Sequence, residues 1–255
     1  MDLSGAGLMI GGIGDPQEPD ASKHTANNTA THNTILNVSQ EYHGTASLIV
    51  GYTQSSLISH NEIGHVSYSG ISLSWGWGAA SFAGNNHIAN NHIHHIMCGE
   101  LLDGGAIYTL GPQPGSTCHG NYLHNQCEKY GVLYHDGGSG WWNTFDNVVA
   151  ESPNAVWLLI NAYIPTQPFD PGPGPYFNVP FQPPNHVHDI FVDNVTFFNP
   201  KTGRNTTMLD CNSATDPHGD DNCTATDITV VADGEAWPAK AQAIIDNAGP
   251  KMAQL

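Results

Sequence analysis

The chain has 255 residues, with 23 Asp and Glu against only 6 Lys and Arg, so its formal net charge is −17. So few basic side chains cannot neutralise nucleic-acid phosphates, an anionic membrane surface or a polyanionic substrate, which argues against these partners. The 28 glycines and the low content of charged residues (11%) favour many short strands joined by turns over long helices.

An asparagine followed two residues later by an aliphatic residue recurs along the chain. Five copies, spaced 28, 30, 30 and 26 residues apart, begin at Asn33, Asn61, Asn91, Asn121 and Asn147. A further copy begins at Asn194, after a long insertion. A repeat of this length, with short strands and no helical stripe, is typical of a solenoid. We expect the asparagines to face inward, each stacking on its copy one coil away.

A second strand lies between successive asparagines. Its apolar column, expected to face the core, contains Leu8, Leu48, Ile71, Ile107, Leu133 and Val156. The next residue of each strand is expected to face outward, because side chains alternate along a strand. This outward column contains Met9, Ile49, Ser72, Tyr108, Tyr134 and Trp157. The pattern predicts an all-β fold, a single-stranded parallel β-helix (solenoid) with a short C-terminal capping helix.

The whole chain, 1–255, is expected to form one β-helix domain that lacks an N-terminal portion. Residues 161–186 are rich in Pro and Gly and predict a loop insertion draped on the solenoid. Residues 236–249 place Pro238 near the start and Gly249 at the end of a predicted helix, which would cap the last open coil.

Cys211 and Cys223 enclose a polar, Asp-rich stretch, which predicts a loop closed by a disulfide bond. The N-glycosylation pattern Asn-X-Ser/Thr occurs at Asn27, Asn37, Asn194, Asn205 and Asn222. Five such sites and a disulfide favour a secreted, extracellular glycoprotein. The chain has no apolar run of transmembrane length.

The outward column predicts a carbohydrate-binding surface, because the C–H faces of sugars pack on aromatic rings. Aromatic side chains exposed together on a sheet also lower solubility unless they bind a ligand. The residues expected to bind a substrate there are Trp75, Trp77, Tyr108, Tyr134, His135 and Trp157. The alternative is that the Pro- and Gly-rich loop covers these rings.

Two acidic residues adjoin this surface. Asp136 occupies a position that is small or apolar in the other copies, and Asp103 precedes Gly104 and Gly105. Glycoside hydrolysis needs two carboxyl groups, about 5 Å apart for retention and about 6.5–9.5 Å apart for inversion. Straight strands would separate Asp103 and Asp136 by about 23 Å, so the two glycines would have to bend the chain. A turn role for each aspartate is the alternative.

Histidines number 15, and His92, His94 and His95 are clustered. His65 and His124 belong to the copies of the repeat on either side. Stacked polar residues at a solenoid corner explain this pattern, so we predict no metal ion and no cofactor. A metal site is the alternative.

Four segments together resemble glycoside hydrolase family 141, a group of right-handed β-helix proteins with α-L-fucosidase and xylanase activities. They are residues 71–78 (ISLSWGWG), 91–95 (NHIHH), 103–115 (DGGAIYTLGPQPG) and 237–245 (WPAKAQAII). The resemblance implies a right-handed helix and a pair of catalytic carboxyl groups. Asp103 matches the acid that opens the GGxIYTLG motif, and Asp136 matches the first acid of the family's Tyr-x-Asp-Glu-Gly pattern. Gly137 replaces the Glu of that pattern.

These observations predict a glycoside hydrolase that acts as a monomer on a cell-wall or extracellular polysaccharide or oligosaccharide. One of Asp103 and Asp136 would be the acid and the other the base or nucleophile. A polysaccharide lyase on the same fold is an alternative, although that chemistry favours Lys or Arg and only Lys129 lies near the proposed cleft. A non-catalytic carbohydrate-binding or structural β-helix is another.

Overall fold

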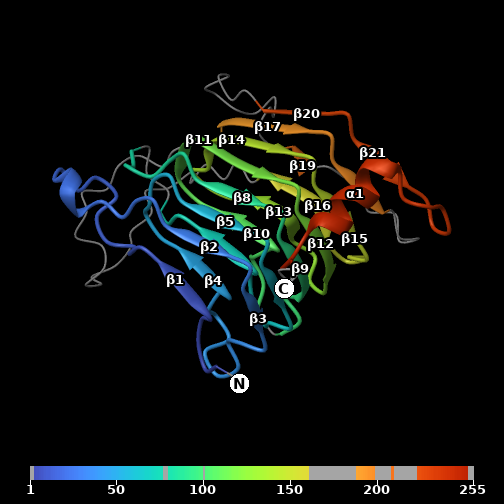
Figure 1. Cartoon of the computed structure of the whole chain (residues 1–255), viewed down its shortest axis with the longest axis horizontal. Helices are drawn as coiled ribbons and strands as arrows, with labels where there is room; N and C mark the ends of the chain where they lie inside the picture. The colour runs from blue at the N-terminus through green and yellow to red at the C-terminus, as the bar shows by residue number, and fades with distance from the viewer. Residues whose placement is uncertain are drawn as a thin grey trace, which may run out of the picture.

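The computed structural model describes residues 3–76, 80–99, 101–160, 188–198, 208–209 and 223–251. They form three parallel sheets of seven strands each, together with the short 3-10 helix η1 (Ala21–Lys23) and the helix α1 (Ala239–Asn247). Strands of one sheet lie side by side in chain order, from blue to red in Figure 1. The predicted all-β class is therefore confirmed.

The chain visits the three sheets in turn and repeats this cycle seven times. The first sheet contains β1 (Leu8–Ile10), β4 (Leu48–Val50), β7 (Ile71–Leu73), β10 (Ile107–Thr109), β13 (Gly131–His135), β16 (Val156–Ile160) and β19 (Met208–Leu209). The second contains β2 (Thr29–Thr31), β5 (Leu57–Ser59), β8 (His87–Ala89), β11 (Pro112–His119), β14 (Gly140–Phe145), β17 (His188–Asp193) and β20 (Thr224–Thr226). The third contains β3 (Thr34–Leu36), β6 (Glu62–Gly64), β9 (His92–Ile96), β12 (Tyr122–Gln126), β15 (Val148–Ala150), β18 (Thr196–Phe198) and β21 (Thr229–Val231). This arrangement fits the predicted parallel β-helix, and we call one passage through the three sheets a coil.

The predicted apolar column of the first sheet is confirmed through five strands. Leu8, Leu48, Ile71, Ile107 and Leu133 pair with one another in register. The last strand departs from the prediction, because Leu133 pairs with Leu158 and not with Val156. The run from Val156 to Ile160 is continuously apolar, so it lacks the alternation that specifies register.

The asparagine ladder is also confirmed. Amide side chains hydrogen-bond from one coil to the next along Asn33, Asn61, Asn91, Asn121 and Asn147, with distances of 2.8–3.0 Å. The ladder ends there, because Val195 and not Asn194 occupies the next position, before the pairing of Val148 with Thr196. Val195 is fully buried. The prediction that Asn194 begins another copy is wrong by one residue.

The sequence patterns did not reveal the second sheet. Its three-residue strands often place a single inward residue between outward ones, as Ile58 and Ile88 do in β5 and β8. Such triplets are too short for an alternating pattern to stand out. The three sheets together enclose one hydrophobic core.

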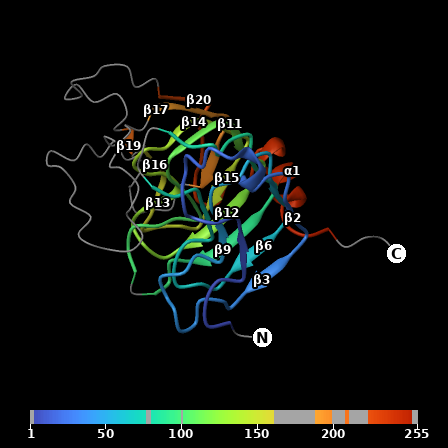
Figure 2. The ribbon, with the colours of Figure 1, turned by 90° about the vertical axis from the view of Figure 1, so that its left-hand side faces the viewer.

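Helix α1 lies within the predicted range 236–249 but occupies a different place from the predicted cap. Lys240 forms an ion pair with Asp146 (2.8 Å), and the Gly249 N–H donates to the carbonyl of Asn90 (2.9 Å). Asp146 and Asn90 belong to corners of different coils, so the helix runs along the side of the stack and bridges coils. Figure 2 shows it on the opposite side of the molecule from β13 and β16.

A disulfide bond joins Cys98 to Cys127 on consecutive coils, and Cys118 is buried and reduced. Cys223 is also disulfide-bonded, whereas Cys211 lies outside the described residues, as does the predicted loop 161–186. Within the described part of the chain, no helix is long and apolar enough to cross a membrane.

Candidate active site

Asp136 directly follows β13 on the first sheet and is nearly buried, with 7% of its surface exposed. Its N–H donates to the carbonyl of Thr109 in the neighbouring coil (3.0 Å), and its own carbonyl accepts from the Ser139 N–H (2.9 Å). The side chain is held as well, because the Tyr108 hydroxyl donates to Oδ2 of Asp136 (2.6 Å). Backbone and side chain together hold this carboxyl group at the end of the strand.

Asp103 lies in the loop before β10, in the left-handed backbone region (φ 62°) that aspartate tolerates better than most residues. The Tyr68 hydroxyl donates to its carbonyl (2.7 Å), and the Tyr134 hydroxyl donates to its Oδ1 (2.9 Å). Gly105 allows the close approach of this loop to β13, because a Cβ there would lie 2.2 Å from the carbonyl oxygen of Gly131. The loop therefore bends Asp103 onto the side chain of Tyr134.

The two aspartates belong to one cluster. Tyr134, bonded to Asp103, packs its ring edge-on against that of Tyr108, bonded to Asp136, with ring centroids 5.1 Å apart. This short chain of contacts cannot span the separation of about 23 Å that straight strands predict, so that estimate is wrong. The physical reason is the turn at Asp103 and the glycine contact that follows it.

The carboxyl groups have unlike surroundings. Burial and the charge of Asp136 raise the pKa of Asp103, although the hydrogen bond from Tyr134 acts in the opposite direction. Asp103 as a whole is exposed, so this burial concerns its carboxyl end. Burial also raises the pKa of Tyr68 to about 12 and that of Tyr108 still further, which keeps both hydroxyls as donors at neutral pH. Two carboxyl groups with differing environments are typical of an acid and base pair.

An apolar cluster separate from the core surrounds these groups. It consists of Tyr108, Leu110, Tyr134, Val156 and Leu159, with Tyr130 packed against it. The Tyr130 ring stacks on that of Tyr134 (6.1 Å), and the Lys129 ammonium lies 5.8 Å from the centroid of Tyr130. Tyr108 and Tyr134 lie outside the main core, on the predicted outward column, but both are almost fully buried and present no exposed aromatic surface.

Two predicted substrate-binding residues instead face the core. Trp157 is 4% exposed and packs in the main core, because the register of β16 places Leu159 beside Tyr134. His135 is also buried, and its ring nitrogens contact the hydroxyls of Thr109 (2.9 Å) and Thr144 (3.3 Å). Burial lowers the pKa of His135 to about 3, so it stays neutral. Neither side chain faces the outer surface of the first sheet.

The other predicted tryptophans follow β7. Trp75 is 42% exposed, two coils before Asp136 at the same edge of the sheet, and its carbonyl accepts from the Tyr52 hydroxyl (2.5 Å). Trp77 lies outside the described residues. Trp75 is therefore the predicted tryptophan that the structure leaves accessible near this edge.

The predicted glycosylation sites have different surroundings. Asn27 and Asn37 are exposed at left-handed corners (φ 57° and 55°). Asn194 is half-buried, and its amide donates to a carboxylate oxygen of Asp146. Asn205 and Asn222 lie outside the described residues.

Tyr68 contacts Asp103 and was not identified from the sequence. It lies in the turn before β7 and contacts the carbonyl of Asp103 only because consecutive coils stack. No spacing or motif in the sequence connects these two residues, which are 35 positions apart.

No family model and no curated protein matches the chain. Among solved structures, a protein described as a glycoside hydrolase is similar, with a TM-score of 0.57 and 31% sequence identity. The similarity covers 63% of this chain and 29% of that chain, so the chain matches less than a third of that protein's length. This likeness supports a fold like that of a glycoside hydrolase.

Proposed function

We propose that this protein is a secreted glycoside hydrolase built on a right-handed parallel β-helix, with Asp103 and Asp136 as its catalytic carboxyl groups. The observation that carries the proposal is the convergence of both aspartates on the Tyr108–Tyr134 pair. A similar solved structure described as a glycoside hydrolase supports it.

Asp103 has the surroundings of the general acid. Its raised pKa favours the protonated form, which would donate a proton to the glycosidic oxygen as the bond from that oxygen to the anomeric carbon breaks. Asp136 accepts a hydrogen bond from the Tyr108 hydroxyl and would supply the second carboxylate. That carboxylate would either take a proton from the attacking water or attack the anomeric carbon itself. In the second case, water then hydrolyses the glycosyl ester.

The substrate class follows from charge and aromatic content. Lys129 is the cation on the aromatic cluster, and a net charge of −17 repels polyanions. A neutral glycan is therefore the expected substrate, whereas a lyase would need groups that neutralise a uronate. The disulfide bond between Cys98 and Cys127 supports an extracellular location.

The first test is the release of reducing sugar from neutral and acidic polysaccharides and aryl glycosides. Asp103→Asn and Asp136→Asn would be compared with Asp227→Asn, an exposed aspartate in the same left-handed conformation (φ 50°). We expect both site variants to lose activity by about 10²-fold or more, and the control to retain it.

Three outcomes would contradict the proposal. Full activity in both site variants would remove the aspartates from catalysis. A product with an unsaturated, ultraviolet-absorbing end would identify a lyase. Folded protein that binds a glycan on the panel but cleaves none would identify a binding protein.

A further inference from the structure

A group of histidines lies on the outer face of the third sheet, on elements distinct from the aspartate site. His65 directly follows β6, and His94 and His95 belong to β9. Gly64 pairs with His94, so His65 and His95 occupy the same corner of consecutive coils, both in the left-handed region (φ 57° and 49°). Their rings stack with centroids 4.6 Å apart.

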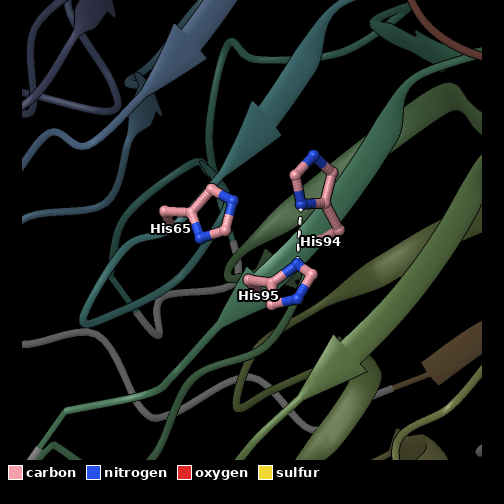
Figure 3. Close-up of side chains that lie close together, drawn as sticks. All are labelled: His65, His94 and His95. Carbon is pink, nitrogen blue, oxygen red and sulfur yellow. Dashed lines mark hydrogen bonds between the residues drawn. The ribbon is translucent and has the colours of Figure 1, made fainter.

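The three rings gather around one point (Figure 3). One nitrogen of each of His65, His94 and His95 lies within 4.8 Å of the other two. The Nδ1 atoms of His94 and His95 face each other at 2.9 Å. Two such nitrogens either share one hydrogen or both direct lone pairs at a cation.

Gly64 makes room for this arrangement. A Cβ at Gly64 would lie 2.5 Å from Cε1 and 2.7 Å from Nδ1 of His94. The His94 ring therefore occupies the space that a side chain at residue 64 would fill. Any other residue at this position would push away the nitrogen that faces His95.

Glu62 orients the same ring from its other side. Its Oε1 lies 3.4 Å from Nε2 of His94, so the carboxylate favours a hydrogen on Nε2. That tautomer leaves the lone pair of His94 on Nδ1, the atom directed at His95. A carboxylate behind a ligating imidazole is the usual outer partner of a histidine–metal bond.

We propose that His65, His94 and His95 bind one zinc ion or a similar first-row divalent ion, with Glu62 as a positioning residue. Imidazole nitrogens suit such ions, and tetrahedral ligands would lie about 3.3 Å apart. The His94–His95 separation of 2.9 Å and the limit of 4.8 Å on all three pairs are compatible with this value, so modest ring rotations complete the site. His65 and His95 are exposed, which leaves a coordination position for water or an external ligand. This site departs from the sequence prediction of no metal.

Stacking of histidines at a corner, the explanation expected from the sequence, does not account for the position of His94. His32 and His60 also stack at left-handed corners of consecutive coils, with centroids 5.0 Å apart. The stacked pair His65 and His95 differs from the pair His32 and His60 because a third histidine, His94, lies beside it. A second grouping, Glu62, His92 and His94, shares that residue. We favour the three-histidine set because it supplies three imidazole nitrogens and leaves Glu62 to orient His94 through Nε2.

The test is calorimetric titration of Zn²⁺ into the untagged, chelator-treated full chain. We expect one ion per chain for the unsubstituted protein. His94→Ala, His65→Asn and His95→Asn should each weaken binding by about tenfold or more, and Glu62→Gln by a similar factor. Asn suits the two corner positions because Asn37 and Asn125 adopt the same left-handed conformation in the flanking coils.

Two further variants separate coordination from folding. Gly64→Ala keeps every ligand but displaces the His94 ring, so it should weaken binding about as much as His94→Ala. His60→Asn removes a stacked corner histidine outside the site and should leave binding within about twofold. Circular dichroism would confirm that each variant is folded. The absorption of bound Co²⁺ should show tetrahedral coordination, which His65→Asn abolishes.

The proposal is wrong if the unsubstituted chain binds no stoichiometric zinc, or if His60→Asn weakens binding as much as the ligand variants do. It is also wrong if His92→Asn abolishes binding while His65→Asn and His95→Asn do not, because the ion would then belong to the second grouping. Binding does not depend on the proposed hydrolase activity, so the two proposals fail independently.

Discussion

At the residue scale, each aspartate of the candidate active site accepts a hydrogen bond from a tyrosine hydroxyl. Tyr134 donates to Asp103, whose pKa is nevertheless raised by burial and by the charge of Asp136. The Tyr134 bond therefore opposes the larger effects, and its role is to limit how far the pKa of Asp103 rises. The pH dependence of the proposed reaction should report this balance.

Tyr134→Phe should move the alkaline limb of the pH profile of kcat/KM to higher pH. The Tyr134 hydroxyl stabilises the carboxylate form of Asp103, so its removal raises the pKa of Asp103 and keeps the acid protonated to higher pH. Steady-state hydrolysis across pH measures the shift. Tyr130→Phe, whose ring stacks on that of Tyr134, serves as the control and should leave the limb in place. An alkaline limb that falls or stays put in Tyr134→Phe would contradict the assignment of Asp103 as the acid.

At the element scale, the asparagine ladder joins each strand of the third sheet to the next. Each inner asparagine uses both ends of its amide. Asn91 donates to Oδ1 of Asn121 (3.0 Å) and to the carbonyl of Ile58 (3.0 Å), and its own Oδ1 accepts from the side chain of Asn61 (2.9 Å). In the coil after Asn147, the buried Val195 occupies the equivalent position, so an apolar side chain fits there once the ladder has ended.

Asn91→Ala should lower the free energy of unfolding by about 3–5 kcal/mol. The change leaves the side-chain amide and the backbone N–H of Asn61, and the carbonyl of Ile58, without their partner in the core. Urea unfolding followed by circular dichroism measures the loss. Asn33→Ala, at the exposed end of the ladder, is the matched control and should cost about 1 kcal/mol or less. Equal losses in the two variants would show that the ladder does not act through burial.

At the scale of the whole molecule, links between coils supplement the sheets. The Cys98–Cys127 disulfide joins consecutive coils, and α1 bridges coils through Lys240 and the C-terminal Gly249. In a stack where each coil contacts only its neighbours, such links oppose the separation of one coil from the next. The disulfide contributes mainly by restricting the unfolded chain.

Cys98→Ala combined with Cys127→Ala should lower the free energy of unfolding by about 3–4 kcal/mol, the value expected for a loop closed over this separation. It should also steepen the dependence on denaturant, because the unfolded chain exposes more surface once the cross-link is gone. Cys118→Ala removes a buried thiol and no cross-link, so only its midpoint should fall. An unchanged midpoint in the double variant would contradict this account.

Periodic features of the sequence determined the architecture. An inward asparagine needs hydrogen-bond partners on the neighbouring coils, and a copy at the same place in each coil supplies them, so the spacing of Asn33 to Asn147 specified both the repeat and its length. The alternation around Leu48 and Ile107 specified which side of the first sheet is buried, because side-chain direction along a strand is a local property. The continuous apolar run of β16 has no alternation, and its register was therefore predicted wrongly.

Only the tertiary structure decided which side chains outside the repeating columns meet between coils. The turn at Asp103 and the contact of Gly105 with Gly131 bring two aspartates together that straight strands keep apart. The same holds for His94, whose ring reaches His95 and His65 because Gly64 leaves space for it. Such contacts depend on the path of the loops and on the space left by a neighbouring coil. A one-dimensional pattern records neither, since it encodes only the direction and spacing of side chains along the chain.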